Sequence, residues 1–553
     1  MMDNRSQEEE EEGKKKIPEI KTYPVPFPVG ENQENLTIYT NTLSKPSKDQ
    51  IINQAFEFQS EGNISEAAKY YQHFINQDFK DHRVFSNYGV ILRDLGKLQE
   101  AEISLRKAIE LNPDYAKAHL NLGNILRDLG KLQEAEISLR KAIELNPDYA
   151  KAHSNLGNIL NDLGKSQEAE ISLRKAVEIK PDLAEAHYNL GGILSNLGNF
   201  EEAEISLRKA IELQPDFARA YFSLSTLKYS NKNTIWKDNL FSETILKNKS
   251  KEDEIHIYFA RANILHKEKN YEESYKWLNL ANTLKLYLKP SKPEIIINKS
   301  RALLIQSYKN EITKKEQMQS PKSIFIVGMP RSGSTLLESI LTMNTCVNDL
   351  GESDILEESF LEQKEVDQKL TIAQLYWKKA NSLKGAINIT TNKNLYNYQY
   401  AGIICNQIPN AKIIHCCRNP LDNILSIYRA NFAIGNEYSS SLVDCARVYL
   451  NQEDLMTGYK NRFRSKIYDL NYDLLVSNPN IEIKSLISWL GWKWNESYLT
   501  PHLNPRSIFT RSNVEVRSPI NSKSINGWKN YKDMLKPAIE ILTQTDKYHY
   551  ITS

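Results

Sequence analysis

The sequence has few cysteines, no excess of charge of either sign and no long hydrophobic segment. Its 5 cysteines are an odd, sparse set in 553 residues, which suits a reducing compartment. Lysine and arginine number 71 against 69 acidic residues, so no overall field favours nucleic acid or a membrane surface. No hydrophobic run approaches the roughly 18 residues that a membrane-spanning helix needs. No cysteine or histidine pattern has the spacing of a structural zinc site. We therefore expect a cytoplasmic protein with no nucleic-acid, membrane or metal partner.

The N-terminal segment is polar and rich in proline. Glu8 to Glu12 precede Lys14 to Lys16, the reverse of a basic-then-hydrophobic signal peptide, and the extended stretch YPVPFPVG follows at Tyr23 to Gly30. A segment of this composition buries too little hydrophobic surface to fold. We expect residues 1–48 to form a disordered tail.

A repeat with a period of 34 residues follows the tail. Glycine and proline both recur at this interval, at Gly89, Gly123, Gly157 and Gly191 and at Pro113, Pro147, Pro181 and Pro215. One unit, residues 121–154, reads NLGNILRDLGKLQEAEISLRKAIELNPDYAKAHS. Its period, its leucine–glycine pair and its closing proline resemble the tetratricopeptide repeat. We expect an α-helical solenoid over residues 49–300, with a degenerate unit at 53–86, clear units at 87–222 and a worn one near 260–290.

Each repeat unit predicts two short helices that cannot bury their hydrophobic faces alone. The first helix has a stripe of leucine and isoleucine, and the second is crowded with alanine, isoleucine and leucine, at Leu122, Ile125, Leu126, Leu129, Ala135, Ile137, Leu139, Ala142 and Ile143. Small residues at Gly123 and Ala135 let the two helices approach closely. Stacked units would bury these faces and form a concave surface. A repeat array alone is most simply a scaffold for another protein.

From about residue 320 the pattern changes to strands that alternate with helices. We expect strands at 323–327, 387–391, 411–417 and 466–472, and helices at 334–343, near Pro420 and at 481–490. This alternation is typical of an α/β domain with a parallel sheet, here over residues 320–550. Ligands bind such sheets at the carboxyl ends of the strands.

The first of these strands enters a glycine-rich loop. Residues 324–335 read IFIVGMPRSGST, which is nearly the phosphate loop G-x-x-x-x-G-K-[ST] of nucleotide-binding proteins. A glycine-rich turn between strand and helix directs backbone N–H groups and the helix dipole at an anion. Ser334 occupies the lysine position, and Arg331 lies inside the loop. The loop therefore keeps its anion cradle but lacks the lysine that a kinase or hydrolase uses for the outer phosphate.

The loop PRSGST resembles that of sulfotransferases, which bind the 5′-phosphosulfate of 3′-phosphoadenylyl sulfate (PAPS) there. RNPLDNILSIYRANF, at Arg418 to Phe432, resembles the family's 3′-phosphate motif. TNKN at 391–394, YDLL at 472–475 and the block at 511–531 resemble sulfotransferases fused to tetratricopeptide repeats, which are relatives of the tyrosylprotein sulfotransferases. The likeness spans roughly residues 322–545. It implies a P-loop-like sulfotransferase domain that transfers sulfonate from PAPS to a hydroxyl group, leaves PAP as product and needs no metal.

The resemblance also implies roles for individual residues. The donor would be held by Pro330, Arg331, Ser332, Gly333, Ser334, Thr335, Arg418, Ser426, Tyr472 and Lys523. Arg331, Lys393 and Ser512 would act on the leaving-group side, and Glu352 in LGES would be the general base. Three departures stand out. Only one glutamate of the family's G-E-E run is present, and the histidine of the small-molecule branch is missing after Lys393. Gly527 stands where relatives often have a basic residue that helps to hold the 3′-phosphate. Lys523 or Lys529 would have to take over that positive charge.

Alternatives stay open at this stage. Glu352 could cap a helix or form a salt bridge, Arg331 could pair with Glu338, and Arg418 could pair with Asp422. His415, Cys416 and Cys417 read as core residues of a hydrophobic strand. The chain could also be a P-loop kinase or hydrolase, or a repeat scaffold with an inactive sheet domain. The acceptor is open between tyrosine, another hydroxyl, a glycan and a small molecule.

The repeats carry a regular row of polar residues that suggests a protein partner. Asparagine occupies one position in successive units and aspartate follows two helical turns later, at Asn87, Asn121, Asn155 and Asn189 and at Asp94, Asp128 and Asp162. The row resembles the repeats of protein O-GlcNAc transferase, in which such asparagines hold the backbone of an extended peptide. Recent duplication of the units would also produce the row. We expect the concave face to present a protein or peptide acceptor.

Overall fold

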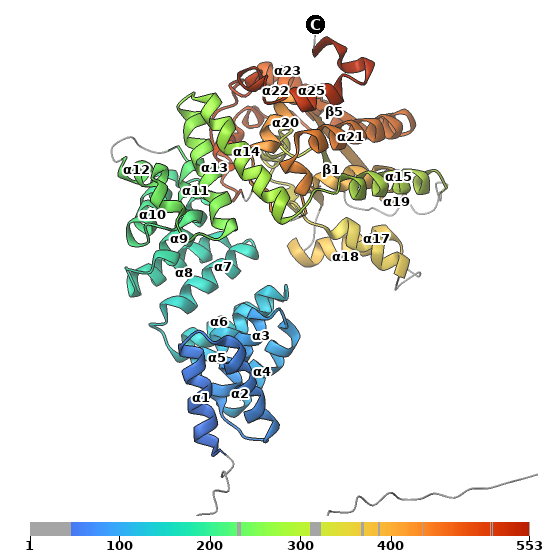
Figure 1. Cartoon of the computed structure of the whole chain (residues 1–553). Coiled ribbons are helices and arrows are strands. Elements are labelled where there is room, and N and C mark those ends of the chain that lie inside the picture. The colour runs from blue at the N-terminus through green and yellow to red at the C-terminus, as the bar shows by residue number, and fades with distance from the viewer. Residues whose placement is uncertain are drawn as a thin grey trace, which may run out of the picture.

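The computed structural model describes residues 46–228, 234–309, 322–365, 370–384, 388–433, 435–508, 510 and 512–551. An N-terminal helical solenoid is followed by a part built around a parallel sheet (Figure 1). The predicted fold class is therefore confirmed. The predicted disordered tail falls almost wholly on residues outside the described ranges.

The solenoid is a series of antiparallel helix pairs. Its first helices are α1 (Lys48–Ser60), α2 (Ile64–Asn76), α3 (His82–Asp94), α4 (Leu98–Leu111), α5 (Ala116–Asp128), α6 (Leu132–Leu145), α7 (Ala150–Asp162), α8 (Ser166–Ile179), α9 (Ala184–Leu197) and α10 (Phe200–Leu213). It continues through α11 (Ala218–Thr226), α12 (Ile235–Phe241), α13 (Lys251–Lys267) and α14 (Tyr271–Leu288). The unit defined from the sequence at residues 121–154 begins inside α5, so the structural pair starts at Ala116.

Close approach within each pair depends on a glycine of the first helix. A Cβ on Gly123 would lie 2.6 Å from Cγ of Leu139 in the paired helix, so only glycine fits there without a shift. Gly130, at φ +74°, turns the chain between the two helices. The expectation that Ile137 packs inside is wrong, because its side chain is 70% exposed. It lies two residues from buried Ala135 and hence on the opposite face of α6.

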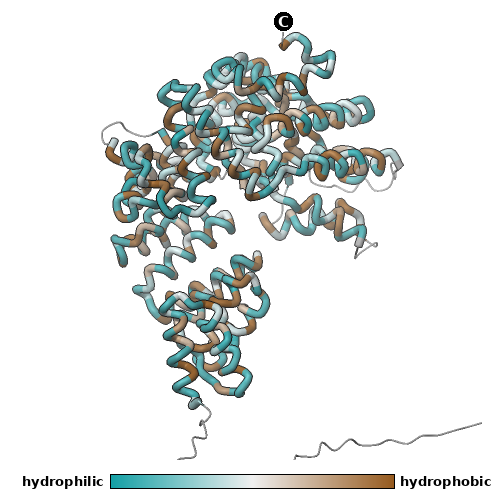
Figure 2. The backbone as a smooth tube through the Cα atoms, in the orientation of Figure 1, coloured by the Kyte–Doolittle hydropathy of each residue, from teal (hydrophilic) through white to brown (hydrophobic). Residues whose placement is uncertain are grey.

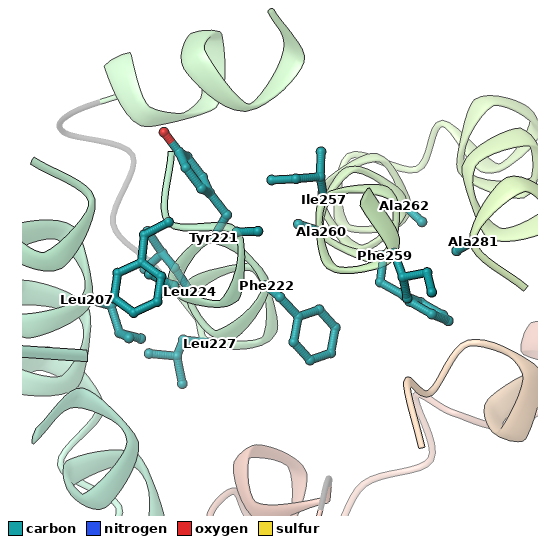
Figure 3. Packing of buried hydrophobic residues seen from close by; sticks show 14 of the residues in the cluster. Leu207, Tyr221, Phe222, Leu224, Leu227, Ile257, Phe259, Ala260, Ala262 and Ala281 are labelled. Atoms are coloured by element: carbon teal, nitrogen blue, oxygen red, sulfur yellow. The ribbon is translucent and has the colours of Figure 1, made fainter. Parts of the chain in front are cut away.

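Hydrophobic residues recur along every solenoid helix rather than gathering in one segment (Figure 2). Toward the C-terminal end of the solenoid the buried side chains become aromatic. Tyr221 and Phe222 of α11 and Phe259 of α13 pack with leucine, isoleucine and alanine from neighbouring helices (Figure 3).

The sheet-containing part has a wholly parallel sheet with strand order β2-β3-β1-β4-β5. Its strands are β1 (Lys322–Gly328), β2 (Val347–Asp349), β3 (Ile389–Asn392), β4 (Ala411–Cys417) and β5 (Ile467–Asn471). The chain moves from β1 to β2 and β3 on one side, then to β4 and β5 on the other. The topological switch point therefore lies beside β1, where a ligand site is expected.

Helices follow the strands and complete this part. They are α16 (Ser334–Leu341), α17 (Ile355–Glu365), α18 (Ile372–Lys384), α19 (Ala401–Gln407), α20 (Pro420–Tyr428), α21 (Leu442–Phe463), α22 (Tyr472–Ser477), α23 (Pro479–Leu490), α24 (Asn513–Val516) and α25 (Lys536–Leu542). Helix α15 (Pro293–Lys309) lies against α21 and α19. Arg462 of α21, for example, donates to the Ser307 carbonyl at 2.8 Å.

The solenoid and the sheet-containing part share one hydrophobic core. Tyr428 and Leu535 belong to the same buried cluster as the solenoid residues Leu207 and Phe259. Polar contacts reinforce this junction, since Asn282 of α14 donates to the Tyr428 carbonyl at 3.0 Å. The predicted domain limits near 49, 300 and 320 stay predictions. Among the described residues, no helix combines the length and hydrophobicity that spanning a membrane requires.

Candidate functional site

The loop after β1 has the conformation of an anion cradle. Arg331 takes a left-handed φ of +66°, which is uncommon outside glycine, and Gly333 at φ +90° caps the start of α16. A Cβ on Gly328 would lie 2.5 Å from the Cys416 carbonyl oxygen, and one on Gly333 would overlap the Tyr472 ring. The Ser332 hydroxyl is buried and has no hydrogen-bond partner among the described residues. A strained, tightly packed turn with an unused donor is a feature of a ligand site.

Arg331 reaches across the end of the sheet and joins three segments. Its Nε donates to Ser426 Oγ of α20 at 2.9 Å, and its Nη1 donates to Ser512 Oγ at 2.5 Å. Its Nη2 lies 3.1 Å from a carboxylate oxygen of Glu515, which is largely exposed. The pairing of Arg331 with Glu338 considered above is wrong. The structure brings Arg331, Ser426 and Ser512 together, whereas the resemblance implies that Ser426 acts with Arg418 at the 3′-phosphate.

Arg418 begins the loop after β4 and lies beside the first loop. Its Nη1 donates to the Arg331 carbonyl at 3.0 Å, and its Nη2 donates to the Ser524 carbonyl at 2.9 Å. The Tyr472 ring lies under the guanidinium, 4.9 Å from its centre, and the Tyr472 hydroxyl is 2.8 Å from Ser524 Oγ. Burial lowers the pKa of Arg418. Its Nε has no partner among the described residues.

Asp422 does not form the salt bridge with Arg418 that was considered above. Its carboxylate accepts hydrogen bonds from the backbone N–H groups of Asn526 and Trp528, at 2.7 and 2.9 Å. These bonds hold the segment around Gly527 against the start of α20. Lys523 and Lys529 are both exposed, so each side chain is accessible from solvent.

Lys393 and Glu352 form an ion pair at the other side of the loop. Lys393 Nζ lies 2.6 Å from Glu352 Oε1, and the lysine side chain is 1% exposed whereas the glutamate is 61% exposed. The backbone N–H of Lys393 also donates to the Gly351 carbonyl at 2.8 Å. Glu352 therefore forms the salt bridge considered above, but its second carboxylate oxygen and its exposure leave it accessible to a hydroxyl group.

A buried acidic residue lies beneath this pair, in a position that the sequence did not predict. Glu338 of α16 is 2% exposed, accepts from Arg506 Nη1 at 3.0 Å, and lies 4.0 Å from Lys393 Nζ. The same Arg506 nitrogen contacts Asp349 at 3.0 Å, at the end of β2. Glu338, Arg506 and Asp349 thus fix the segment that carries Glu352. Their positions follow from contacts over long sequence distances, which no local motif indicates.

The solenoid contacts the segment that carries Ser512. Asn513 Nδ2 donates to Ser195 Oγ at 3.0 Å, and the Ile508 backbone N–H donates to the Asn196 carbonyl at 3.1 Å, both at the end of α9. Arg517 donates to the Asn196 carbonyl at 3.3 Å. The hydroxyl that Arg331 binds is therefore supported from the repeats.

The predicted polar row lies on the first helices of the units, with its asparagines half-buried and its aspartates exposed. The asparagine amides donate to the preceding unit, from Asn121 to Ser86, Asn155 to Asn124 and Asn189 to Ser154, at 3.3, 2.7 and 3.2 Å. Asp128 and Asp162 pair with Arg93 and Arg127 of the preceding unit. Part of the row therefore connects neighbouring units. Asn87 Oδ1 also accepts from Lys117 at 3.3 Å, whereas the Oδ1 atoms of Asn121, Asn155 and Asn189 accept no hydrogen bond from the described residues and are left for a peptide.

One group of histidine, cysteine and aspartate side chains is close enough to contact a single ion. His415, Cys417 and Asp469 place their donor atoms within 4.8 Å of one another. Lys460 and Arg464 already contact Asp469, at 3.1 and 2.9 Å. Because these cations oppose a further positive charge, we assign no metal to the group.

Comparisons with known proteins agree with this architecture. Residues 351–496 match a model described as "Sulfotransferase family", and tetratricopeptide-repeat models match residues 89–126, 123–164, 148–216 and 255–286. The chain joins tetratricopeptide repeats to a sulfotransferase-family domain. The resemblance seen in the motifs is thereby confirmed, and it supports sulfonate transfer as the reaction class.

Two curated relatives match over part of their length. An uncharacterized protein of Aquifex aeolicus is 28% identical over 317 residues, which cover 52% of this chain and 41% of the relative. A protein-tyrosine sulfotransferase of Drosophila melanogaster is 22% identical over 231 residues, or 37% of this chain and 46% of the relative. The chain thus spans less than half the length of either relative.

Solved structures of repeat proteins also match. A crystal structure of MamA is 26% identical, covers 30% of this chain and 96% of that chain, and gives a TM-score of 0.27. YrrB, described as a TPR protein with an unusual peptide-binding site, is 24% identical, covers 37% of this chain and 100% of that chain, and also gives a TM-score of 0.27.

Proposed function

We propose that this protein transfers a sulfonate group from PAPS to a hydroxyl group of a protein or peptide held by the repeats. The observation that carries the proposal is the contact between the two arginine-bearing loops, Arg418 Nη1 to the Arg331 carbonyl at 3.0 Å. PAPS has a 5′-phosphosulfate and a 3′-phosphate on one nucleoside, so it needs two neighbouring anion sites. ATP has no 3′-phosphate and would use only one of them.

The residues of both loops fit such a donor. Ser332 Oγ and Arg418 Nε are buried donors without partners among the described residues, and both would gain partners on an anion. Arg331, Lys393 and the loop Ser332–Thr335 would hold the phosphosulfate, whereas Arg418 and Ser426 would hold the 3′-phosphate. An arginine fork holds phosphate through two charge-assisted hydrogen bonds. Tyr472, which packs over Gly333 and Arg418, would line the site, with Lys523 or Lys529 at its rim.

Glu352 is the proposed general base. Its exposed carboxylate would accept the proton of the acceptor hydroxyl while Lys393 holds it in place through the 2.6 Å contact. Arg331, which already binds Ser512, would neutralise the negative charge that develops on the leaving phosphate. Glu338 is buried below Lys393 and cannot reach an acceptor, so it has a positioning role.

The repeats would supply the acceptor. The asparagine row gives an extended peptide a series of amide oxygens that accept backbone N–H groups regardless of sequence. The direct contact between α9 and the Ser512 segment connects this surface to the site. A tyrosine side chain is one candidate hydroxyl, since the Drosophila relative is a protein-tyrosine sulfotransferase.

A transfer assay tests the proposal on the full chain. With radiolabelled PAPS and a tyrosine-containing peptide library, we expect label on peptides. Replacing Asn121, Asn155 and Asn189 together by alanine should lower transfer to peptides while the affinity for PAP is unchanged. Ser86→Ala with Ser154→Ala is the matched control, because it removes two of the same inter-unit hydrogen bonds and keeps the asparagines.

Two results would count against the proposal. Absence of label transfer to any peptide or protein hydroxyl, with PAP still bound, would make the acceptor a different kind of molecule. An equal loss of transfer in the serine control would mean that the asparagines only stabilise the stacking of the units.

A further inference from the structure

A polar cluster lies on the face of the sheet that α21 covers, outside the proposed transfer residues. His415 and Cys417 alternate along β4 and so share one face, and Asp469 is the register partner of His415 on β5. Gln452 and Lys460 of α21 meet them from above. The sequence suggested that His415 and Cys417 are ordinary core residues, but the structure surrounds them with polar groups.

The contacts join the thiol to the histidine ring. Cys417 Sγ lies 3.3 Å from His415 Nδ1, and the same nitrogen lies 3.0 Å from Asp469 Oδ1. The other ring nitrogen, Nε2, lies 2.6 Å from the Gln452 amide nitrogen, and a protonated ring would donate there to the amide oxygen after the amide group turns over. Both ring nitrogens therefore have partners, and the ring is held with its Nδ1 edge toward the sulfur and the carboxylate.

The charges around the cluster favour a proton on the His415 ring, which lies beside the Cys417 sulfur. Burial opposes the charged ring, but the neighbouring Cys417 sulfur and the Asp469 hydrogen bond raise the pKa of His415 to about 9. Lys460 and Arg464 contact Asp469 and add positive charge. The other charged groups near the sulfur are already engaged: Glu453 with Lys547, Asp473 with the Asn419 backbone, and Arg418 with two carbonyls.

Cys417 also differs from the other cysteines in access. Cys405, Cys416 and Cys445 are buried, and burial raises the pKa of each thiol. Cys346 is exposed, and among the described residues no hydrogen bond joins its thiol to a histidine. Cys417 is half-buried in the wall of a polar cavity of about 370 Å³, which Arg418, Lys460 and Tyr548 also line. A thiol that is both accessible and beside a protonated histidine is the reactive kind.

We propose that Cys417 is a reactive thiol that peroxides and other small electrophiles modify, and that the modification acts on the nucleotide site through Arg418. The thiol proton passes to His415, and the thiolate sulfur attacks one oxygen of hydrogen peroxide. A sulfur–oxygen bond forms as the oxygen–oxygen bond breaks, and the departing hydroxide takes the His415 proton and leaves as water. Cys417 becomes a sulfenic acid, oxidised by two electrons, and the peroxide is reduced.

The effect on the nucleotide site follows from position. Arg418 is the next residue along the chain and lines the same cavity. Its guanidinium is the group proposed to bind the 3′-phosphate. An oxygen atom added to Cys417 would disturb the contacts of His415 with Gln452 and Asp469. It would also displace the loop that begins at Arg418. This second step rests on the proposed function, whereas the reactivity of Cys417 does not.

Alkylation rates test the reactivity in the full chain. With limiting iodoacetamide at pH 6.5 and peptide mass spectrometry, we expect Cys417 to react about tenfold faster than exposed Cys346, the reference within the same molecule. His415→Gln should remove this advantage, whereas Cys416→Ser, which changes the neighbouring buried thiol, should keep it. Thermal unfolding of each variant checks that the fold is intact.

Several outcomes would overturn the inference. One is an equal alkylation rate for Cys417 and Cys346, and another is a Cys417 alkylation rate that His415→Gln leaves unchanged in a folded variant. A third is one equivalent of zinc bound to the wild type and absent from Cys417→Ser. For the second step, one equivalent of peroxide should weaken PAP binding severalfold in the wild type and not in Cys417→Ser. If the reduced wild type binds no PAP, the proposed function fails while the alkylation result still decides the thiol. If PAP binds equally before and after oxidation, the coupling to Arg418 is wrong.

Discussion

The solenoid and the sheet-containing part differ in how often each contact occurs. In the solenoid one contact is repeated in successive units: a glycine of the first helix lies against a leucine of the second, at Gly89, Gly123, Gly157 and Gly191. In the sheet-containing part, Arg331 to Ser512 and Lys393 to Glu352 each occur once and join distant segments. A stacked array tolerates the loss of one copy, but a site made of single contacts does not. The following predictions test this difference, from the largest expected effect to the smallest.

Loss of one carboxylate should nearly abolish transfer. Glu352→Gln keeps the side-chain shape but cannot accept a proton, so we expect a rate lower by roughly a hundredfold to ten-thousandfold with PAP affinity retained. Steady-state kinetics with PAPS measure this. Glu358→Gln is the control, because Glu358 is also an exposed glutamate paired with a lysine, Lys379, but lies on α17. Turnover of Glu352→Gln within a few-fold of the wild type would place the base elsewhere.

The polar cluster at His415 should make stability depend on pH. Because its folded-state pKa of about 9 lies above the ordinary 6.5, His415 stabilises the fold below about pH 6.5 and loses this contribution as pH rises through 9. At 1.36 kcal/mol per pKa unit, the rise from 6.5 to about 9 makes the loss roughly 3 kcal/mol. Urea unfolding of the wild type and His415→Gln between pH 6 and 9.5 would show it. Parallel curves for the two proteins would contradict the assignment.

Loss of a buried glutamate charge should lower the free energy of unfolding more than loss of an exposed glutamate charge in the solenoid. Glu338→Gln removes the negative charge between Arg506 and Lys393, and hydrogen bonds to charged groups contribute about 1.5–3 kcal/mol. Glu134→Gln removes an exposed partner of Arg106 and should cost less than about 1 kcal/mol. Urea unfolding compares them. Equal losses of unfolding free energy in the two variants would mean that the repeated surface ion pairs and the ion pairs of the site contribute similarly to stability.

Two glycines at helical positions of the solenoid should respond in opposite directions. Gly123→Ala puts a Cβ 2.6 Å from Leu139 Cγ, and overpacking of this kind costs about 1–3 kcal/mol. Gly192 in α9 has no atom within 4 Å of its added Cβ, so Gly192→Ala should stabilise by up to about 1 kcal/mol through helix propensity. Unfolding free energies give both values. Two destabilised variants would show that α9 does not tolerate the added methyl group.

The difference between repeated contacts and contacts that occur once also explains which features the sequence predicted well. The solenoid helices follow from a period that is visible along the chain, and strand β4 falls at residues 411–417 as expected. The short edge strand β2, the Glu338–Arg506–Asp349 group and the support of the Ser512 segment by α9 were not predicted. These features depend on residues that are far apart in sequence, over more than 150 positions for Arg506 and Asp349. Ile137 was misplaced because its hydrophobicity was given more weight than its helical phase.

The contact of α9 with the Ser512 segment also affects how the repeats should be tested. A fragment that begins near residue 300 would lose the hydrogen bonds of Ser195 and Asn196 as well as the asparagine row. It would also expose the shared core at Tyr428 and Leu535. Its inactivity would not separate a role in acceptor binding from a role in support, so point variants in the full chain are the better test.

Nucleotide binding tests the central claim most directly. Isothermal titration of the full chain with PAP and with ATP–Mg²⁺ compares a ligand that uses both arginine loops with one that uses a single loop. We expect PAP to bind more tightly than ATP–Mg²⁺. Arg331→Ala and Arg418→Ala should each weaken the binding of PAP by about 1.5–3 kcal/mol. Arg447→Ala, which removes an exposed ion pair with Glu294, should leave PAP affinity unchanged. Tight binding of ATP–Mg²⁺ only, or unchanged PAP affinity in both site variants, would contradict the account.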